Sequence, residues 1–518
     1  MMTLHTACIR SKITPLRGLL VLMSTGFLAL SACTLGPDFT RPEPPKVAHY
    51  GAEPLAAKAI ILGKALPGQW WTLYHSEALT KLIQQAIAHN PDLHSAHAAL
   101  TQAEALVLAK KGSLLPTLDA SALSTRQQIS GAQFGNPNAG SSVFNLYNAS
   151  VKVSYTLDVF GAIRRQIETL SAQVEYQQFQ LEAVFLTLSA NIVTTVFQEA
   201  SLRAQLRVSN DLLTAQQQQL ATIEQQFALG SVPKSTVLAQ RVLVAQTQSS
   251  MPALQHALTT TRHQLSVLVG TMPDAEPIPE FSLDDFSLPT PLPVSLPAQL
   301  VTQRPDIRAQ EAIFHAASAQ IGVVMASVFP DFTISANMGS IATQAAGVFT
   351  PGSEIWSMTA NLLQPVFHGG DFTHKRKAAV ASYQQAADSY RSKVLGAFQD
   401  VADTLSALHY DELALASQEA EVNAATENLS LTEAQFSLGS VSYLSLLTAQ
   451  QNVQRARLSK IKAQTMRLAD TAALFQALGG GWWQRSSMAH SLTKQLASEV
   501  EPCEFLSCLI NPLPTPKK

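Results

Sequence analysis

Residues 162–229 read AIRRQIETLSAQVEYQQFQLEAVFLTLSANIVTTVFQEASLRAQLRVSNDLLTAQQQQLATIEQQFAL, 68 positions with neither proline nor glycine. An α-helix rises about 1.5 Å per residue, so this run predicts one helix roughly 100 Å long. Residues 371–438, also 68 positions, hold no proline and one glycine, Gly396, and predict a second such helix. Apolar side chains are spread over more than one face of each run. The two runs therefore predict rods that pack between neighbouring helices in a wall or coiled coil.

A similar hexapeptide ends both runs, FALGSV at 227–232 and FSLGSV at 436–441. Glycine at the end of a helix favours the left-handed conformation that reverses the chain. Return helices are expected over residues 235–269 and 443–478. The hexapeptides thus predict two tight helical hairpins.

Pairs of proline landmarks indicate an internal duplication. HNPDL (89–93) precedes LPTL (115–118), and QRPDI (303–307) precedes FPDF (329–332). Pro91 and Pro305 lie 214 positions apart, as do Pro116 and Pro330. This spacing predicts two repeats, 76–270 and 298–483, joined by a proline-rich connector, 271–297, that should not be helical.

Each repeat also holds two stretches of alternating polarity, which predict strands. The expected strands span about residues 116–128, 146–160, 330–341 and 355–367. Their lengths suit tilted transmembrane strands of about 9–11 residues plus overhang. No segment after the first 35 residues is expected to be a membrane helix. Four strands cannot close a barrel, and lipid tolerates no open edge. We therefore expect an α+β membrane protein in which several chains pool their strands around a symmetry axis, with long helices continuing the barrel.

The N-terminus has the pattern of a lipoprotein signal. Arg10, Lys12 and Arg17 precede an apolar run at 19–30 that is too short for a stop-transfer helix. The following LSAC at 30–33 matches a lipobox, which predicts a signal peptide over 1–32 and lipid on Cys33. Thr34, which is not acidic, favours sorting to the outer membrane. Residues 33–75 are expected to form a lipidated tether and a segment near the middle of the helical part, with TLGPDFTRPEPP extended.

Composition excludes several classes of function. Charged residues make up 14% of the chain and the formal net charge is −2, which argues against a nucleic-acid partner because phosphate binding needs a basic face. His89, His94 and His97 lack a further ligand set, so no metal site is predicted, and no catalytic motif or cofactor loop is present. The chain is not expected to be an enzyme. The tail, 484–518, has no assignable role, and its Cys503 and Cys508 could be paired or free.

Several segments together are similar to outer-membrane efflux factors of the TolC type, in the lipoprotein branch that includes OprM and NodT. The resemblance covers about residues 33–483. It rests on these segments: GPD at 36–38, WWTLYHSEALTKLIQQAIAHNPDL, VSYTLDVFGAIRR, LVTQRPDIRAQEA, QPVFHGG and ALGGGWW at 477–483.

The resemblance implies a homotrimer in the outer membrane of a Gram-negative bacterium, with a β-barrel of four strands per chain above a periplasmic α-helical barrel. It implies a passive exit duct for drugs and other small toxic compounds. The implied partners are a periplasmic adaptor and a proton-driven inner-membrane transporter. A type I secretion duct for proteins or peptides, and a periplasmic coiled-coil scaffold without a pore, remain as alternatives. The substrate range and the identities of the partners cannot be read from these motifs.

The resemblance also implies roles for residues at the helical hairpins. The turns where an adaptor would dock are Gly230, Ser231, Val232, Gly439, Ser440 and Val441. The family carries an Asp in a Leu-Asp-Ala-Gln element near the channel constriction, where this chain has Thr448. A periplasmic gate is therefore expected to use uncharged polar groups, namely Gln240, Tyr443 and Thr448.

Overall fold

The computed structural model describes residues 34–485, except 48–49, 51–59, 131, 133–134, 136–137, 139, 274, 276–277 and 290. The predicted signal peptide, Cys33, Cys503 and Cys508 lie outside the described residues. The chain divides into two compact units. Unit 1 comprises Met1–Pro42, Ala98–Gln178 and Ala309–Arg391, and unit 2 comprises Glu43–His97, Phe179–Arg308 and Ser392–Lys518.

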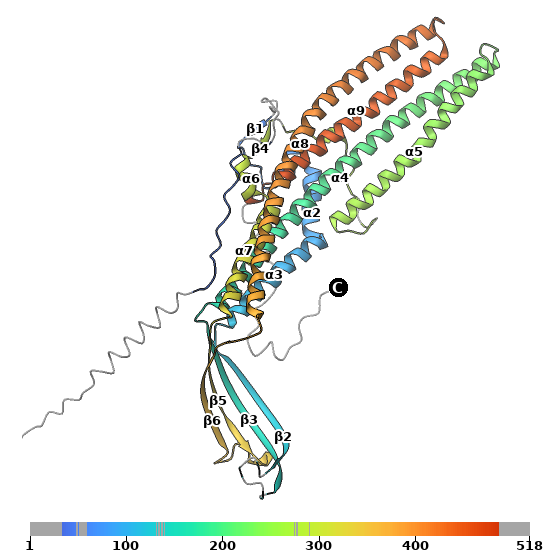
Figure 1. Ribbon diagram of the computed structural model, residues 1–518. Coiled ribbons are helices and arrows are strands. Elements are labelled where there is room, and N and C mark those ends of the chain that lie inside the picture. The colour runs from blue at the N-terminus through green and yellow to red at the C-terminus, as the bar shows by residue number, and fades with distance from the viewer. Residues whose placement is uncertain are drawn as a thin grey trace, which may run out of the picture. The chain divides into compact units, whose positions relative to one another are not determined.

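Unit 1 contains a four-stranded antiparallel sheet in the order β2-β3-β5-β6 (Figure 1). The strands are β2 (Thr117–Ser130), β3 (Ser141–Leu157), β5 (Asp331–Ala342) and β6 (Glu354–Leu363). β3 starts five residues earlier than the sequence suggested, because its first residues pair with the far end of β2. β6 ends four residues earlier than expected. Pro365 cannot donate to a ladder, and the side chain of Gln364 bonds to the carbonyl oxygens of Val328 and Pro365.

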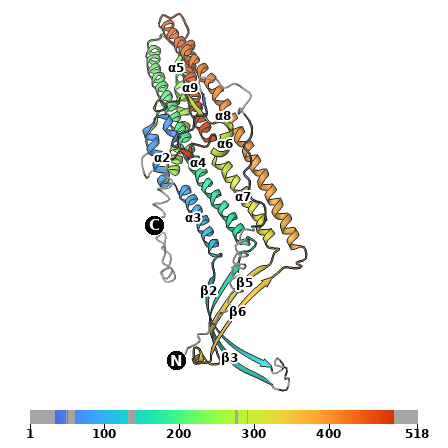
Figure 2. The ribbon, with the colours of Figure 1, turned by 90° about the vertical axis from the view of Figure 1, so that its left-hand side faces the viewer.

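Each strand of this sheet is joined at one end to a helix by a short segment. α3 (Pro91–Gly112) leads into β2, β3 into α4 (Ala162–Ala228), α7 (Pro305–Ala326) into β5, and β6 into α8 (Asp371–Ser437). The helices therefore take the order of the strands, with α3 and α8 at the two edges, as Figure 2 shows.

The two long helices are confirmed, with 67 residues in α4 and 67 in α8. Their return helices are α5 (Lys234–Val269), which contains Pro252, and α9 (Tyr443–Ala477). An 18-residue window of α4 is long and apolar enough to cross a membrane, although half of that window is buried against the rest of the protein.

The stretch from Glu77 to Gly112 is rich in Ala, Leu and Gln and predicts a single helix, but the structure has two helices there. α2 (Glu77–His89) ends at Asn90, which has φ −69° and ψ 121°. Pro91 excludes helical geometry from the residue before it, and the Asn90 side chain then accepts bonds from the N–H groups of Asp92 and Leu93 at 3.0 and 3.1 Å. α6 (Pro297–Gln303) and α7 are separated in the same way by extended Arg304 before Pro305.

Unit 2 has an aromatic core around the short helix η1 (Trp70–Tyr74). Trp70, Trp71 and Tyr74 are almost fully buried. Tyr74 makes ring contacts with Phe197 of α4 and Phe475 of α9, and Trp70 makes one with Phe475. Large buried rings carry much of a core's burial energy. This cluster therefore anchors the segment before α2 to α4 and to the return helix α9.

The proline-rich connector takes part in a small second sheet that the sequence did not predict. β1 (Ile60–Leu62) and β4 (Leu292–Val294) pair in parallel. The connector also holds one 3₁₀ turn, η4 (Leu283–Asp285). Three-residue strands are too short to produce a readable alternation, which explains why they were missed. The other single turns are η5 (Ala345–Gly347) and η6 (Trp482–Gln484).

Candidate functional site

In its part nearest the helices, the four-stranded sheet has one apolar face and one polar face. Directly paired residues of antiparallel strands point to the same side of the sheet. The register therefore shows on which face each side chain lies. One row across the sheet is Leu118, Val153, Ala336 and Met358, and the next is Thr117, Ser154, Ser335 and Thr359. The apolar face continues with these residues: Ala120, Val151, Ile334, Met338, Trp356, Ala360 and Leu362. The polar face continues with these: Asp119, Ser121, Ser150, Lys152, Thr333, Asn337, Ser357 and Asn361.

Most of the apolar face is uncovered in the single chain. Met338, Met358 and Trp356 are 73%, 74% and 81% exposed. A contiguous exposed apolar surface of this kind needs a partner or a lipid environment. The edge strands β2 and β6 each pair on one side only among the described strands. The sheet can thus face lipid on one side and water on the other, provided that its edges are paired.

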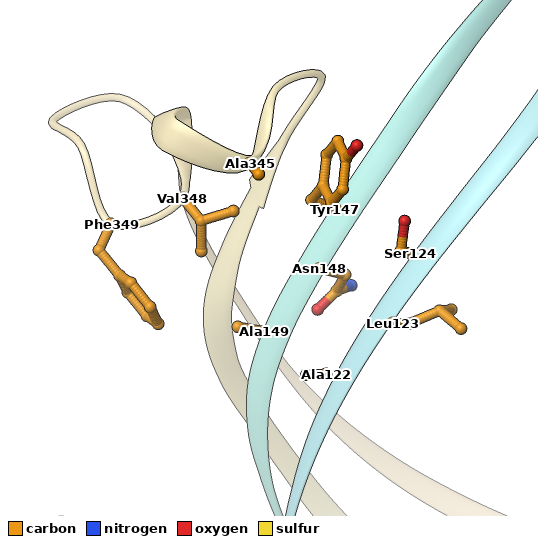
Figure 3. A pocket seen from close by; sticks show the side chains of 9 residues that line it. All are labelled: Ala122, Leu123, Ser124, Tyr147, Asn148, Ala149, Ala345, Val348 and Phe349. Carbon is orange, nitrogen blue, oxygen red and sulfur yellow. The ribbon is translucent and has the colours of Figure 1, made fainter.

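The loop between β5 and β6 folds back over the apolar face near the end of the sheet (Figure 3). The Phe349 N–H donates to Ser340 Oγ at 2.9 Å, and Ser340 and Ser353 share a hydrogen bond of 2.6 Å. The loop and the strands β2 and β3 line a shallow hollow, formed by Ala122, Leu123, Ser124, Tyr147, Asn148, Ala149, Ala345, Val348 and Phe349. No charged or nucleophilic cluster lines this hollow.

Residues just after the predicted lipid site are held against unit 1 by Arg165 of α4. This side chain is 4% exposed and donates to the carbonyl oxygens of Leu35 and Gly36 at 3.0 and 3.3 Å. It also forms ion pairs of 2.7 Å with Asp38 and with Glu168. The segment expected as a tether is therefore extended but fixed.

Two further contacts hold the same segment. Phe39 stacks on His315 with ring centroids 4.6 Å apart, and Arg41 Nε lies 2.5 Å from Glu311 Oε1. Thr34 packs so closely against Gly161 that a side chain at position 161 would clash with it. Gly161, with φ +77°, is also a position that favours glycine.

The two hairpin turns have the same geometry. Gly230 and Gly439 have φ +75° and +70°. In each turn the next serine N–H returns to the helix, Ser231 to the Gln226 oxygen at 2.9 Å and Ser440 to the Gln435 oxygen at 3.0 Å. Such bonds satisfy the carbonyl groups that a helix end leaves free.

Both turns also present an apolar side chain to solvent. Leu229 is 82% exposed and Leu438 is 83% exposed. Ser231, Gly439 and Ser440 are exposed as well, whereas Val232 and Val441 are half-buried. The two turns are therefore equivalent in backbone geometry and in exposure.

Of the three expected gate residues, the structure brings two together. The Tyr443 hydroxyl donates to Gln240 Oε1, and Gln240 Nε2 donates to the Gln216 carbonyl oxygen at 2.8 Å. Gln240 is fully buried, and burial raises the pKa of Tyr443 above its usual value. These bonds join α9 to α5 and α4. Thr448 is exposed and bonds only to the Leu444 oxygen of its own helix, at 2.9 Å.

Sequence reasoning missed a buried ionic cluster at Glu199. This residue is 0% exposed in the middle of α4, and its carboxylate lies 2.5 Å from Arg203 Nε and 3.1 Å from Arg262 Nη1. It also accepts a bond from the Phe281 N–H at 3.3 Å. The cluster ties α4 to α5 and the connector. The spacing of Glu199 and Arg203 is visible in the sequence. The other partners of Glu199, which are Arg262 and Phe281, lie 63 and 82 positions away and carry no local signal.

Arg304 and Asp306, at the start of α7, form a structural junction. Arg304 bonds to Asp306 at 2.8 and 3.0 Å, to Asp400 at 2.8 Å and to the Ala477 oxygen at 3.3 Å. Asp306 accepts from the Ile307 N–H at 3.0 Å. This arrangement connects the start of α7 to α8 and the end of α9.

The histidines near α2 and α3 make local bonds to the backbone. His89 Nδ1 lies 2.9 Å from the Gln85 oxygen and His94 Nε2 lies 3.1 Å from the Ala88 oxygen. Across the part of the chain that the structure describes, no three His, Cys, Asp or Glu side chains are placed to hold a metal ion.

Residues 82–271 and 296–480 match the family described as outer membrane efflux protein. The chain belongs to this family. The efflux protein is 29% identical over 421 residues to the pyoverdine export outer membrane protein OpmQ of Pseudomonas aeruginosa, covering 80% of this chain and 87% of that one. It is 26% identical over 462 residues to the cation efflux system protein CusC of Escherichia coli, covering 88% of this chain and 97% of CusC.

Solved channels share its fold. The outer-membrane channel OprN matches with a TM-score of 0.80 and 25% identity, over 87% of this chain and 100% of OprN. The open-state channel MtrE of Neisseria gonorrhoeae matches with a TM-score of 0.75 and 25% identity, over 87% and 99% of the two chains.

These similarities confirm the function predicted from the sequence. The efflux protein is an outer-membrane channel of a tripartite efflux system, and its family supports this function, not the type I secretion duct. The family forms channels, and the relatives named above are export and efflux proteins and not enzymes.

Proposed function

We propose that three copies of the efflux protein form a passive exit duct for drugs and other small toxic compounds. β2 of one copy would pair with β6 of the next, so that three sheets of four strands close a barrel. The observation that carries this proposal is the two-faced sheet with unpaired edges. Closure pairs every edge group, turns the apolar face to lipid and leaves the polar face lining water.

The long helices would continue the duct below the barrel. Because each helix follows its strand, closing the sheet also brings α3 of one copy beside α8 of the next. Symmetric closure of this kind is the simplest way to satisfy both layers. The two repeats predicted from the sequence would then alternate around the wall.

Lipid on Cys33 is proposed to anchor each chain in the outer membrane. The proposal is supported by the Arg165 contacts, which hold residues 35–38 beside the start of α4, close to where β3 ends. A lipid on the preceding residue would then lie near the strand–helix boundary. Apart from this lipid, no cofactor is proposed.

The periplasmic adaptor is proposed to dock on the two turns that carry Gly230 and Gly439. Their shared backbone geometry and exposed leucines support this role. A proton-driven inner-membrane transporter would supply the energy and select the cargo. The channel itself would contribute only a route.

The Tyr443–Gln240 bond is proposed to hold the periplasmic end closed. A gate built from hydrogen bonds and a narrow bore needs no acidic ring. Tyr443→Phe should raise the open probability of the channel in planar bilayers by at least about threefold, because one net hydrogen bond contributes about 1 kcal/mol. Tyr410→Phe, an exposed tyrosine of α8, is the matched control, and equal gating of both variants would refute the gate.

The duct itself is tested by conductance and by drug susceptibility. Purified wild-type protein should run as a heat-modifiable trimer and conduct ions in planar bilayers. Deleting the protein from cells that lack a redundant channel should increase their sensitivity to amphiphilic toxins. Monomers without conductance would instead support a periplasmic scaffold without a pore.

A further inference from the structure

The helix ends at the two edges of the sheet carry cations that the exit duct does not use. Lys110 and Lys111 lie in the last turn of α3, just before edge strand β2. Lys375, Arg376 and Lys377 lie near the start of α8, just after edge strand β6. Lys111, Lys375, Arg376 and Lys377 are exposed, and Lys110 is half-buried.

Little negative charge offsets these cations within the described residues. Lys375 pairs with Asp371 at 2.7 Å, with both side chains more than half exposed. An exposed pair of this kind is largely screened. Each of the other four cations makes no ion pair with a described residue.

Exposed apolar side chains lie next to the cations of α8. Val366 and Phe367 are 90% and 85% exposed. They precede Gly369 and Gly370, whose φ values of +58° and +86° turn the chain into the helix. Apolar side chains beside lysine and arginine are typical of a membrane boundary, where the apolar part enters lipid and the charge reaches the headgroups.

Closing the barrel would bring the two groups of cations together. β2 and β6 are opposite edges of one sheet, so within one chain α3 and α8 are far apart in the order of elements. Between neighbouring copies, β2 pairs with β6 and α3 of one copy comes beside α8 of the next. Lys110 and Lys111 then face the same boundary as Lys375, Arg376 and Lys377 of the adjacent copy.

We propose that this basic seam, defined by Lys110, Lys111, Lys375, Arg376 and Lys377, binds the phosphate headgroup of an anionic phospholipid in the periplasmic leaflet. The inference rests on the proposed trimer. Clusters of Lys and Arg at a membrane surface attract anionic lipids. A lipid at each seam would bridge two copies where the strands give way to helices.

The test is lipid selectivity of the purified full-length trimer. The protein is placed in nanodiscs of phosphatidylglycerol and phosphatidylethanolamine, and the lipids that remain bound after mild detergent extraction are quantified by mass spectrometry. Wild type should be enriched in phosphatidylglycerol. The variant K375Q/R376Q/K377Q should lose at least about fivefold of that enrichment, because each basic side chain near an anionic surface contributes a factor of this order. K110Q/K111Q should also lose enrichment.

The matched control removes three cations from α9 in unit 2, as R455Q/R457Q/K462Q, and should keep the wild-type enrichment. Inorganic phosphate is added in a parallel arm. A trimer that conducts but shows no preference for phosphatidylglycerol would overturn the seam and leave the duct intact. Full displacement of the lipid by millimolar phosphate would show a general anion site and also overturn the proposal. A monomer without conductance would overturn both the seam and the duct.

Discussion

Arg165 shows how one residue can fix a segment that has no secondary structure of its own. Its guanidinium uses several donors at once, on two carbonyl oxygens and two carboxylates. A lysine could not match this fork of planar donors. The residues after Cys33 are thereby held on α4 without a helix or strand.

Arg165→Gln should release that segment. We expect a loss of about 2–3 kcal/mol of stability, because bonds to charged groups are stronger than neutral ones, and faster proteolysis within residues 34–42. Midpoint temperature and limited proteolysis measure the two effects. Arg391→Gln, whose pair with Asp388 is 75% and 72% exposed, should change stability by less than about 0.5 kcal/mol. Equal behaviour of the two variants would contradict the role of Arg165.

Asp411 of α8 is a second residue whose effect can be measured, because its protonation changes the stability of the protein with pH. Burial and the neighbouring Asp470 of α9 raise the pKa of Asp411 to about 6, against the opposing effect of Arg467. A raised carboxyl pKa means that the folded protein prefers the protonated form. The stability from this site is therefore present below pH 4 and is lost as the pH rises to about 6.

Asp411→Asn should stabilise the protein at pH 7.5 but not at pH 4. A shift from 3.8 to about 6 corresponds to roughly 3 kcal/mol for a fully buried group. Because Asp411 is partly exposed, about 1 kcal/mol is expected after screening. Thermal unfolding at the two pH values measures the difference. A gain of equal size at both would show that charge repulsion is not the cause.

At the scale of elements, prolines set where the helices of both halves begin. Asn90 and Arg304 are extended because Pro91 and Pro305 follow them. Asn90 then caps α3 and donates to the Leu268 oxygen at 3.0 Å, which links the α2–α3 junction to the end of α5.

Asn90→Ala should lower the stability of unit 2 by about 1–2 kcal/mol, the usual effect of losing a cap. The variant also leaves the Leu268 oxygen without its donor. Chemical denaturation followed by tryptophan fluorescence reports on the nearby Trp70 and Trp71 core. Asn423→Ala, at an exposed position of α8, is the control, and the role of the cap is refuted if both variants lose equally.

For the whole molecule, the proposed barrel predicts that the two faces of the sheet tolerate charge differently. Ser335 and Ala336 are neighbours near the middle of β5, yet they point to the polar and the apolar face. If the apolar face meets lipid, a cation there costs about 2–4 kcal/mol at the bilayer centre.

Ala336→Lys should therefore greatly reduce assembly of trimers in the outer membrane, whereas Ser335→Lys should assemble and alter only conductance. Heat-modifiable mobility of membrane fractions measures assembly. Reversed outcomes would mean that the faces are assigned the wrong way round.

The sequence by itself determined the long rods, their glycine turns and the strand pairs, because each depends on local properties. A few neighbouring positions are enough to encode a helix free of proline, a left-handed glycine turn or a strand of alternating polarity. The turns at Gly230 and Gly439 are likewise encoded by their own hexapeptides. The break at Asn90 was also encoded, in Pro91, although it was not recognised there.

Tertiary structure alone decided the contacts between residues distant in the chain. Glu199 meets Arg262, Arg165 meets Asp38, and Tyr443 meets Gln240, each across at least 63 positions. The register that divides the sheet into two faces, and the pairing of β1 with β4, depend on the same long-range packing. A single sequence carries no local signal for such pairs, because their energies exist only after the helices and strands have come together.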